Sequence, residues 1–126
     1  RKALKVLSEY VEYEAMGDGF TWDTENTEQD KKTARDAFEI AKEKLMSDKY
    51  QMIIFDEINY VLDYQFFPLE EFLETLRNKP KNVHVVCSGR NANEKLIEMA
   101  DLVTEMKLIK HPYDDQGIPA QKGIEF

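Results

Sequence analysis

The chain has 126 residues, of which 42% are hydrophobic and 33% are charged. This balance excludes a disordered chain, and the length predicts a single domain over residues 1–126. The 25 acidic residues exceed the 17 basic ones, giving a net charge of −8. Without a basic stripe, neither a nucleic acid nor an anionic membrane surface is expected as a partner. No apolar run approaches the ~20 residues of a membrane span, and the single cysteine favours a reducing, cytoplasmic setting.

The first half of the chain predicts a strand, a helix and a second strand. A short strand is expected over residues 11–16, before a turn that contains two glycines. Residues 30–46 carry apolar side chains spaced by three and four, which is the pattern of one face of a helix. Residues 51–55 form an almost continuous apolar run, which is typical of a strand covered on both faces.

The second half continues this alternation. A helix is expected from Pro68, a buried strand over residues 83–87, a short helix over 93–100 and a last strand over 101–109, followed by an irregular tail. Strands separated by helical stretches predict an α/β fold with a mostly parallel sheet and helices on both of its faces. In such sheets, ligands bind beyond the carboxyl ends of the strands.

Asp56 and Glu57 directly follow the apolar strand over residues 51–55. Mg²⁺ prefers hard oxygen ligands and often takes one or two carboxylates together with phosphate oxygens. The pair is therefore a candidate metal site. Taken alone the pair is weak evidence for a metal, and the alternative is the start of a solvated loop, which the pattern favours.

Arg90 and Asn91 follow the next strand after Gly89, which permits a tight turn. The guanidinium of Arg90 offers a planar set of donors suited to phosphate or carboxylate. An ordinary turn is the alternative, with Asn91 or Asn93 capping the next helix and Arg90 paired with a nearby acid.

Phe20 and Trp22 lie two residues apart in the loop after the first predicted strand. Large aromatic side chains in such a loop often cover an apolar ligand face. The alternative is that both rings fold back into the core, which the pattern alone favours slightly.

Several segments together resemble, in order, the P-loop ATP:corrinoid adenosyltransferases, also called cob(I)alamin adenosyltransferases. The aromatic loop and the C-terminal tail are the specific parts, whereas the Asp-Glu pair is shared with many ATPases. The matching segments are GDGFTWDT at 17–24, FDEINY at 55–60, PLEE at 68–71, SGRNA at 88–92, ADLVTEM at 100–106, KHPY at 110–113 and AQKGIEF at 120–126.

This resemblance implies a P-loop NTPase sheet of the RecA-like type and a reaction between two substrates. The Co(I) ion of a corrinoid attacks the 5′ carbon of ATP and releases triphosphate, whose charge Mg²⁺ neutralises. Glu57 is implied as the direct Mg²⁺ ligand, with Asp56 supporting it or a bound water. The family also suggests a homodimer, and the need for Co(I) suggests an electron-donor protein.

The resemblance also assigns the aromatic residues a catalytic role. Phe20 and Trp22 are expected to press against the lower face of the corrin ring and to exclude the lower axial ligand, which makes Co(II) easier to reduce. The residues implied in binding ATP or the corrinoid are Gly19, Phe20, Thr21, Trp22, Arg90 and Asn91.

One departure from the family pattern concerns the phosphate-binding loop. The motif G-x-x-x-x-G-K-[ST] does not occur in the 126 residues, which begin with Arg1 rather than Met. The family places this motif before the point where the chain begins. The chain is therefore interpreted as the C-terminal portion of an adenosyltransferase domain, N-terminally incomplete, with an irregular tail over 111–126. These residues alone are expected to bind ATP poorly and to be inactive.

Two other functions remain open. The first is a different P-loop ATPase that shares only the sheet and the Asp-Glu pair, which the aromatic loop argues against. The second is a non-catalytic module that binds a corrinoid without using ATP. Formation of triphosphate rather than ADP, and of an adenosylated product, separates these alternatives from the transferase.

Overall fold

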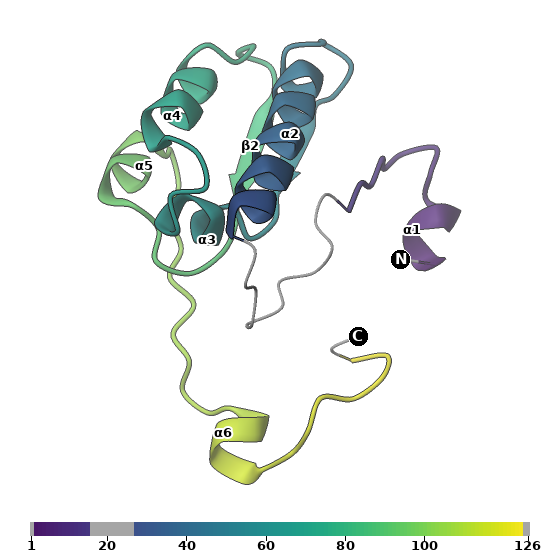
Figure 1. Cartoon of the computed structure of the whole chain (residues 1–126). Helices are drawn as coiled ribbons and strands as arrows, with labels where there is room; N and C mark the ends of the chain where they lie inside the picture. The colour runs from purple at the N-terminus through teal and green to yellow at the C-terminus, as the bar shows by residue number, and fades with distance from the viewer. Residues whose placement is uncertain (1, 16–26, 125–126) are drawn as a thin grey trace.

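The computed structural model describes residues 2–15 and 27–124. The helices formed by residues 27–99 pack against a small sheet, while α1 and α6 lie apart from them on extended segments (Figure 1). In chain order the elements are α1 (Lys2–Val6), α2 (Thr27–Leu45), β1 (Met52–Phe55), α3 (Ile58–Asp63), α4 (Leu69–Arg77), β2 (His84–Cys87), α5 (Glu94–Met99) and α6 (Pro112–Gln116).

The two strands pair in parallel, as the sequence predicts. Met52 of β1 lies opposite His84 of β2, and Phe55 lies opposite Cys87. The helices α3 and α4 connect the strands. A parallel pair needs such a crossover, because the chain must return to the end of the sheet at which the first strand began. This arrangement confirms an α/β fold and brings the ends of β1 and β2 together.

The predicted helices α2, α4 and α5 are confirmed, with small shifts at their ends. Pro68 precedes α4 in an extended conformation, and Asn93 caps α5 by accepting a hydrogen bond from the Lys95 backbone N–H at 3.0 Å. Within α5, however, only Leu96 is buried, and Ile97 is 42% exposed. The spacing of Leu96, Ile97 and Ala100 predicts that all three point inward, but Ile97 and Ala100 are exposed, because α5 contacts the core through a narrower side.

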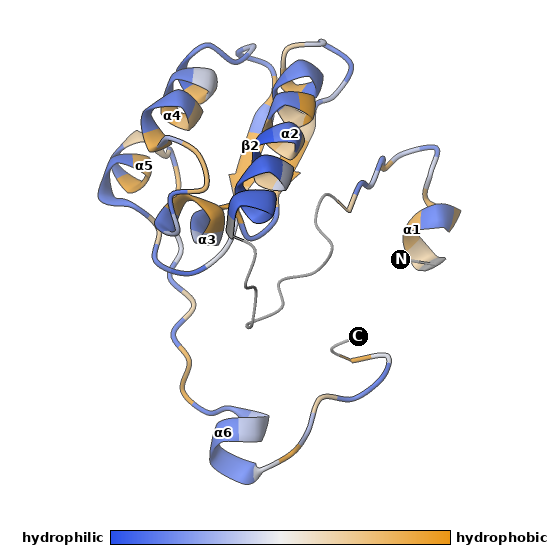
Figure 2. Cartoon of the chain, in the orientation of Figure 1, coloured by the Kyte–Doolittle hydropathy of each residue, from blue (hydrophilic) through white to orange (hydrophobic). Residues whose placement is uncertain are grey.

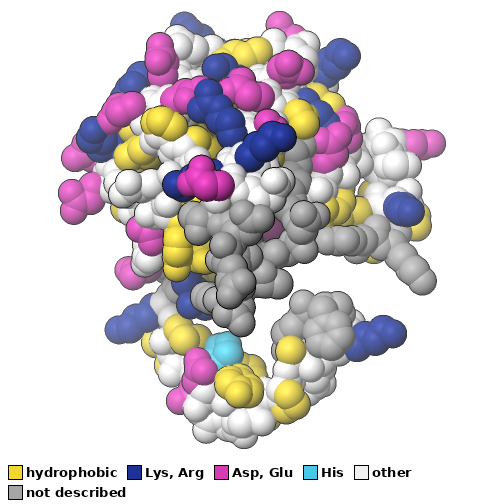
Figure 3. Space-filling model, in the orientation of Figure 1, with side chains coloured by type: hydrophobic (Ala, Val, Ile, Leu, Met, Phe, Trp, Pro, Cys, Tyr) yellow, Lys and Arg dark blue, Asp and Glu magenta, His cyan; other side chains and the backbone are white. Residues whose placement is uncertain are grey.

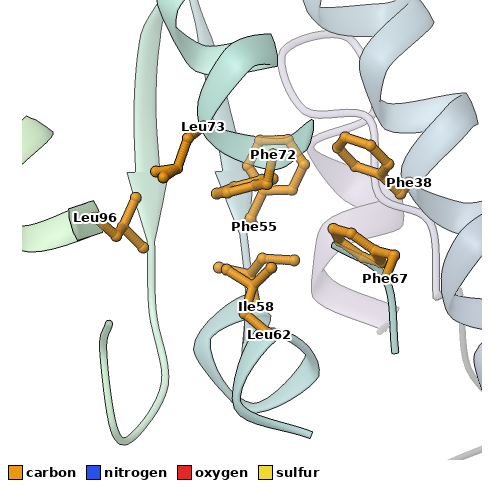
Figure 4. Close-up of a cluster of buried hydrophobic side chains, with 8 residues drawn as sticks. All are labelled: Phe38, Phe55, Ile58, Leu62, Phe67, Phe72, Leu73 and Leu96. Carbon is orange, nitrogen blue, oxygen red and sulfur yellow. The ribbon is translucent and has the colours of Figure 1, made fainter. Parts of the chain in front are cut away.

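A core rich in aromatic side chains joins the helices to one side of the sheet. Phe38 stacks on Phe67 with ring centroids 4.5 Å apart, and Phe72 meets Phe55 edge to face at 5.3 Å. Figure 4 shows these side chains converging from α2, β1, α4 and the segment that precedes α4. The full buried cluster is Phe38, Phe55, Ile58, Leu62, Phe67, Phe72, Leu73 and Leu96.

The two faces of the sheet differ sharply in burial. Ile53, Phe55, Val85 and Cys87 contact the core on one face. On the other face, the apolar side chains Met52, Ile54 and Val86 are 53%, 62% and 42% exposed. In Figure 2, β2 is hydrophobic toward its carboxyl end, whereas its first residue, His84, is hydrophilic. The prediction of helices on both faces is therefore wrong for the described residues, in which only one face is covered.

Two predicted strands do not form in the described part of the chain. Residues 11–15 and 101–109 contain no strand. Leu102, Met106 and Ile109 are instead 84%, 93% and 82% exposed. An alternating apolar pattern becomes a strand only where a neighbouring strand supplies hydrogen-bond partners. Neither segment has such a neighbour among residues 2–15 and 27–124.

Three short helices were not predicted. α1 lies before the first expected strand, and α6 lies in the tail that was expected to be irregular. α3 follows the acidic pair directly, and its residues Ile58, Asn59 and Leu62 are buried. α3 has only six residues, too few for its apolar side chains to show a helical period clearly.

Candidate functional site

The acidic pair lies where the two parallel strands end side by side. The backbone N–H of Ser88 donates to the Phe55 carbonyl at 3.1 Å, so the pairing of β2 with β1 continues one residue beyond the strands. This places Ser88 next to Asp56 and Glu57. We call Asp56, Glu57, Asn59, Ser88 and Gly89 the strand-end junction.

The side chain of Ser88 connects both acids. Its Oγ donates to Asp56 Oδ1 at 2.7 Å and accepts from the Glu57 backbone N–H at 3.0 Å. The residue pattern around Ser88 predicts a turn and indicates no role for its side chain. The parallel register of β1 and β2 could have identified Ser88, because the residue after Cys87 lies opposite the residue after Phe55.

Glu57 has an unusual backbone conformation. Its φ is 58°, in the left-handed region, and it precedes α3 without a side-chain capping hydrogen bond. An L-residue in this region costs roughly 1–2 kcal/mol. Asp56 and Glu57 are both exposed. The junction therefore presents two adjacent carboxylates to solvent.

Gly89 and Asn59 hold the two loops of the junction close together. Gly89 has φ 121°, and a Cβ there would lie 3.1 Å from Asn59 Cβ and 3.4 Å from Glu57 Cα. The Asn59 side chain donates to the Gly89 carbonyl at 3.3 Å, and its backbone N–H donates to the Ser88 carbonyl at 3.2 Å. Asn59 is 6% exposed, and its Oδ1 has no hydrogen-bond partner within the described residues. Glycine is thus required where the two loops meet.

The structure separates the roles of the residues after β2. Asn93, rather than Asn91, caps α5. Asn91 has φ 55° and donates through Nδ2 to Asp63 Oδ2 at 2.9 Å. Arg90 is exposed and forms no ion pair with any acid in residues 2–15 or 27–124, so the pairing alternative is not observed. Its guanidinium is available to an anion near the junction.

The donor set of the junction can be compared with the needs of Mg²⁺. No group of three or more His, Cys, Asp or Glu side chains capable of holding a metal occurs in the described part of the chain. Asp56 and Glu57 supply two carboxylates. Mg²⁺ commonly takes one or two carboxylates and completes its octahedron with water and phosphate oxygens. The junction therefore fits Mg²⁺ that arrives with a phosphate-bearing substrate.

Gly19, Phe20, Thr21 and Trp22 lie outside the described residues. The segment over residues 11–15 precedes them in the chain and is attached to the end of α2. Lys44 Nζ contacts Glu12 and lies 2.9 Å from Glu14 Oε1, and the Tyr50 hydroxyl donates to Glu12. The hydrogen bonds from Lys44 and Tyr50 lower the pKa of the Glu12 carboxyl.

The charged side chains of the visible surface are mixed in sign. Basic and acidic groups alternate over the helices in Figure 3, without a broad basic area on that face. Lys95 of α5, for example, pairs with Glu70 of α4. None of the described helices is long and apolar enough to cross a membrane.

Comparison with known proteins gives one consistent result. The sequence model of the family described as "ATP:corrinoid adenosyltransferase BtuR/CobO/CobP" matches residues 1–126. A protein from Sinorhizobium named corrinoid adenosyltransferase is 45% identical over 97% of this chain and 57% of its own length.

Two further relatives carry the same name. The one from Pseudomonas aeruginosa is 40% identical over 94% of this chain and 58% of its own length. The one from Escherichia coli K12 is 37% identical over 92% of this chain and 59% of its own length. The chain thus spans somewhat more than half the length of these relatives.

Proposed function

Because this chain belongs to the family of ATP:corrinoid adenosyltransferases, we propose that it contributes to the transfer of the 5′-deoxyadenosyl group from ATP to the Co(I) ion of a corrinoid. Triphosphate is the second product, and the reaction serves the synthesis of adenosylated cobalamin. The match of the family over the whole chain is the observation that carries this proposal. The two exposed carboxylates at the end of β1 are compatible with it.

The reaction balances without a further oxidant. The electron pair of Co(I) forms the cobalt–carbon bond, the bond between C5′ and the triphosphate oxygen breaks, and its pair leaves with triphosphate. Bound Mg²⁺ would supply charge neutralisation for that leaving group. Glu57 would hold the ion directly, with Asp56 supporting it or a bound water.

Arg90 provides a second positive charge near the phosphates. It is exposed and forms no ion pair in the described part of the protein, and it follows Gly89 at the junction. A guanidinium can donate two parallel hydrogen bonds to a phosphate group. Asn91 would act beside it, provided that it exchanges its contact with Asp63 for one to the substrate.

Phe20 and Trp22 would act on the corrinoid. Two aromatic rings against the lower face of the corrin would exclude the lower axial ligand and so raise the potential of the Co(II)/Co(I) couple. For a one-electron couple, each change of about 59 mV alters the ratio of Co(I) to Co(II) tenfold. Gly19 and Thr21 would shape the same loop. We also propose that the protein receives electrons from a donor protein, assembles as a homodimer and acts in the reducing environment of the cytoplasm.

The function is tested with the natural protein that carries this sequence. The protein is incubated with ATP, Mg²⁺ and chemically reduced cobalamin, and the products are the light-sensitive adenosylated corrinoid and triphosphate. Release of ADP instead would favour another P-loop ATPase. Binding of cobalamin without an adenosylated product would favour a binding module.

The role of the aromatic loop is tested separately with Trp22→Ala and the control Trp22→Phe, which keeps an aromatic ring. Trp22→Ala should impair the reduction of bound Co(II) far more than it weakens ATP binding, and Trp22→Phe should retain most of the activity. A loss of ATP affinity with unchanged Co(II) reduction would show that the rings do not act on the corrinoid.

A further inference from the structure

The contacts of Ser88 lead to an inference that rests on the proposed function. We infer that Ser88 is a positioning residue, whose hydroxyl fixes the placement of Asp56 and Glu57 relative to each other for a divalent cation. It does so by donating to the side chain of one acid and accepting from the backbone of the next.

A hydroxyl group is suited to this task because it has one hydrogen to donate and two lone pairs to accept with. The hydrogen of Ser88 Oγ is used on Asp56 Oδ1 at 2.7 Å, and one lone pair takes the Glu57 N–H at 3.0 Å. The first contact restricts rotation of the Asp56 carboxylate. The second contact holds the backbone of Glu57 in its left-handed conformation, which sets the direction of the Glu57 side chain.

These contacts leave carboxylate oxygens of both acids free to bind a cation. In the described part of the protein, Asp56 Oδ2 and both carboxylate oxygens of Glu57 take part in no hydrogen bond or ion pair. Both residues are exposed, whereas Ser88 is half-buried beneath them. The arrangement is that of two cation ligands on a support that orients them and leaves their oxygens free.

The hydroxyl is not needed to hold the two strands together. The ladder between β1 and β2 runs from Met52–His84 to Phe55–Cys87, and the Ser88 backbone extends it. The Ser88 carbonyl also receives the Asn59 N–H at 3.2 Å. These contacts involve backbone atoms and persist when the side chain is shortened. The effect of the hydroxyl on the acids can therefore be separated from its effect on folding.

The test measures Mn²⁺ binding to the natural protein that carries this sequence in the presence of ATP, because phosphate oxygens complete the coordination of the ion. Mn²⁺ is a spectroscopic probe for Mg²⁺, and Mn²⁺ with ATP but without protein is the reference. Free Mn²⁺ is followed by electron paramagnetic resonance for the unsubstituted chain, Ser88→Ala and Ser88→Thr. Loss of a group that orients a metal ligand typically lowers affinity by about 10–100-fold. Ser88→Ala should show a loss of this size, and Ser88→Thr, which keeps the hydroxyl, should bind within a few-fold of the unsubstituted chain.

Thr75→Val is the matched control. It removes a buried hydroxyl whose contact is the Glu71 carbonyl at 2.9 Å, within α4 and away from the junction. This variant should bind Mn²⁺ like the unsubstituted chain, even where its thermal stability falls. If Ser88→Ala does not fold by circular dichroism, Ser88→Cys replaces it, because a thiol is a much weaker donor than a hydroxyl.

The outcomes separate this inference from the proposed function. Equal Mn²⁺ affinity of the unsubstituted chain and Ser88→Ala would overturn the positioning role and leave the metal assignment standing. Equal losses in Ser88→Ala and Ser88→Thr would also overturn it, because the hydroxyl would then not be the active group. Absence of Mn²⁺ binding to the unsubstituted protein in the presence of ATP would overturn the metal assignment of Asp56 and Glu57, and the positioning role with it.

Discussion

Replacement of Glu57 by glycine should stabilise the fold while it removes the proposed metal ligand. Glu57 has φ 58°, and its side chain forms no hydrogen bond that caps α3. The carboxylate therefore gives no compensation for the left-handed backbone within the described residues. An acid that occupies a strained position in spite of this cost is what a ligand role predicts.

The size of the effect follows from two opposing terms. Relief of the left-handed conformation is worth roughly 1–2 kcal/mol for a residue with a Cβ. The greater freedom of glycine in the unfolded chain costs about 0.4–1 kcal/mol. The net gain in the free energy of unfolding is about 0.5–1 kcal/mol, which raises Tm by about 2–4 °C for a domain of this size.

The assay compares three variants by urea denaturation and by Mn²⁺ titration. Glu57→Gln keeps the backbone strain and removes the charge, so Glu57→Gly is measured against it. Gln65→Gly is the matched control, because Gln65 is exposed, has φ 54° and lies beyond the end of α3. Both glycine variants should gain stability, but only the substitutions at Glu57 should lose Mn²⁺ binding.

The reasoning would be refuted if Gln65→Gly gained stability and Glu57→Gly did not gain over Glu57→Gln. The Glu57 side chain would then make a stabilising contribution that its contacts do not reveal. Retention of Mn²⁺ binding in Glu57→Gly would contradict the ligand role independently of the stability result.

Two further predictions concern the core and the segment before the aromatic loop. Phe72 is 0% exposed, and the centroid of its ring lies 5.3 Å from that of Phe55 and 5.9 Å from that of Phe38. Phe72→Ala should therefore lower the free energy of unfolding, measured by urea denaturation, by about 3–5 kcal/mol. A loss under about 1 kcal/mol would contradict this packing. The Glu12 carboxyl has a pKa lowered from 4.5 by its hydrogen bonds from Lys44 and then Tyr50. Its contribution to stability is therefore complete above pH 4.5 and is lost as the pH falls through the lowered pKa. A carbon-13 titration of Glu12 should show a midpoint below 4.5 that Lys44→Met moves back up, and an unchanged midpoint would show that Lys44 does not act on it.

The sequence was informative wherever a pattern is local. Apolar spacing along residues 30–46 predicts α2, and the two short apolar runs predict β1 and β2, because burial imposes its period directly on neighbouring residues. The position of Asp56 and Glu57 after a strand also follows from the sequence alone. Parallel strands separated by helices then bring Asp56 and Ser88 to one edge, which the topology of a βαβ unit requires.

Only the tertiary structure decided features that depend on a distant partner. The run over residues 101–109 has the pattern of a strand, but pairing needs a neighbour that the pattern cannot supply. The same limit applies to the faces of the sheet, since apolar residues on both sides of β1 do not reveal that only one side is covered. The role of Ser88 depends on its register with Asp56, and the need for glycine at position 89 depends on the close approach of Asn59. Sequence periodicity reports what each segment buries, whereas pairing, register and strain arise only when segments far apart in the chain meet.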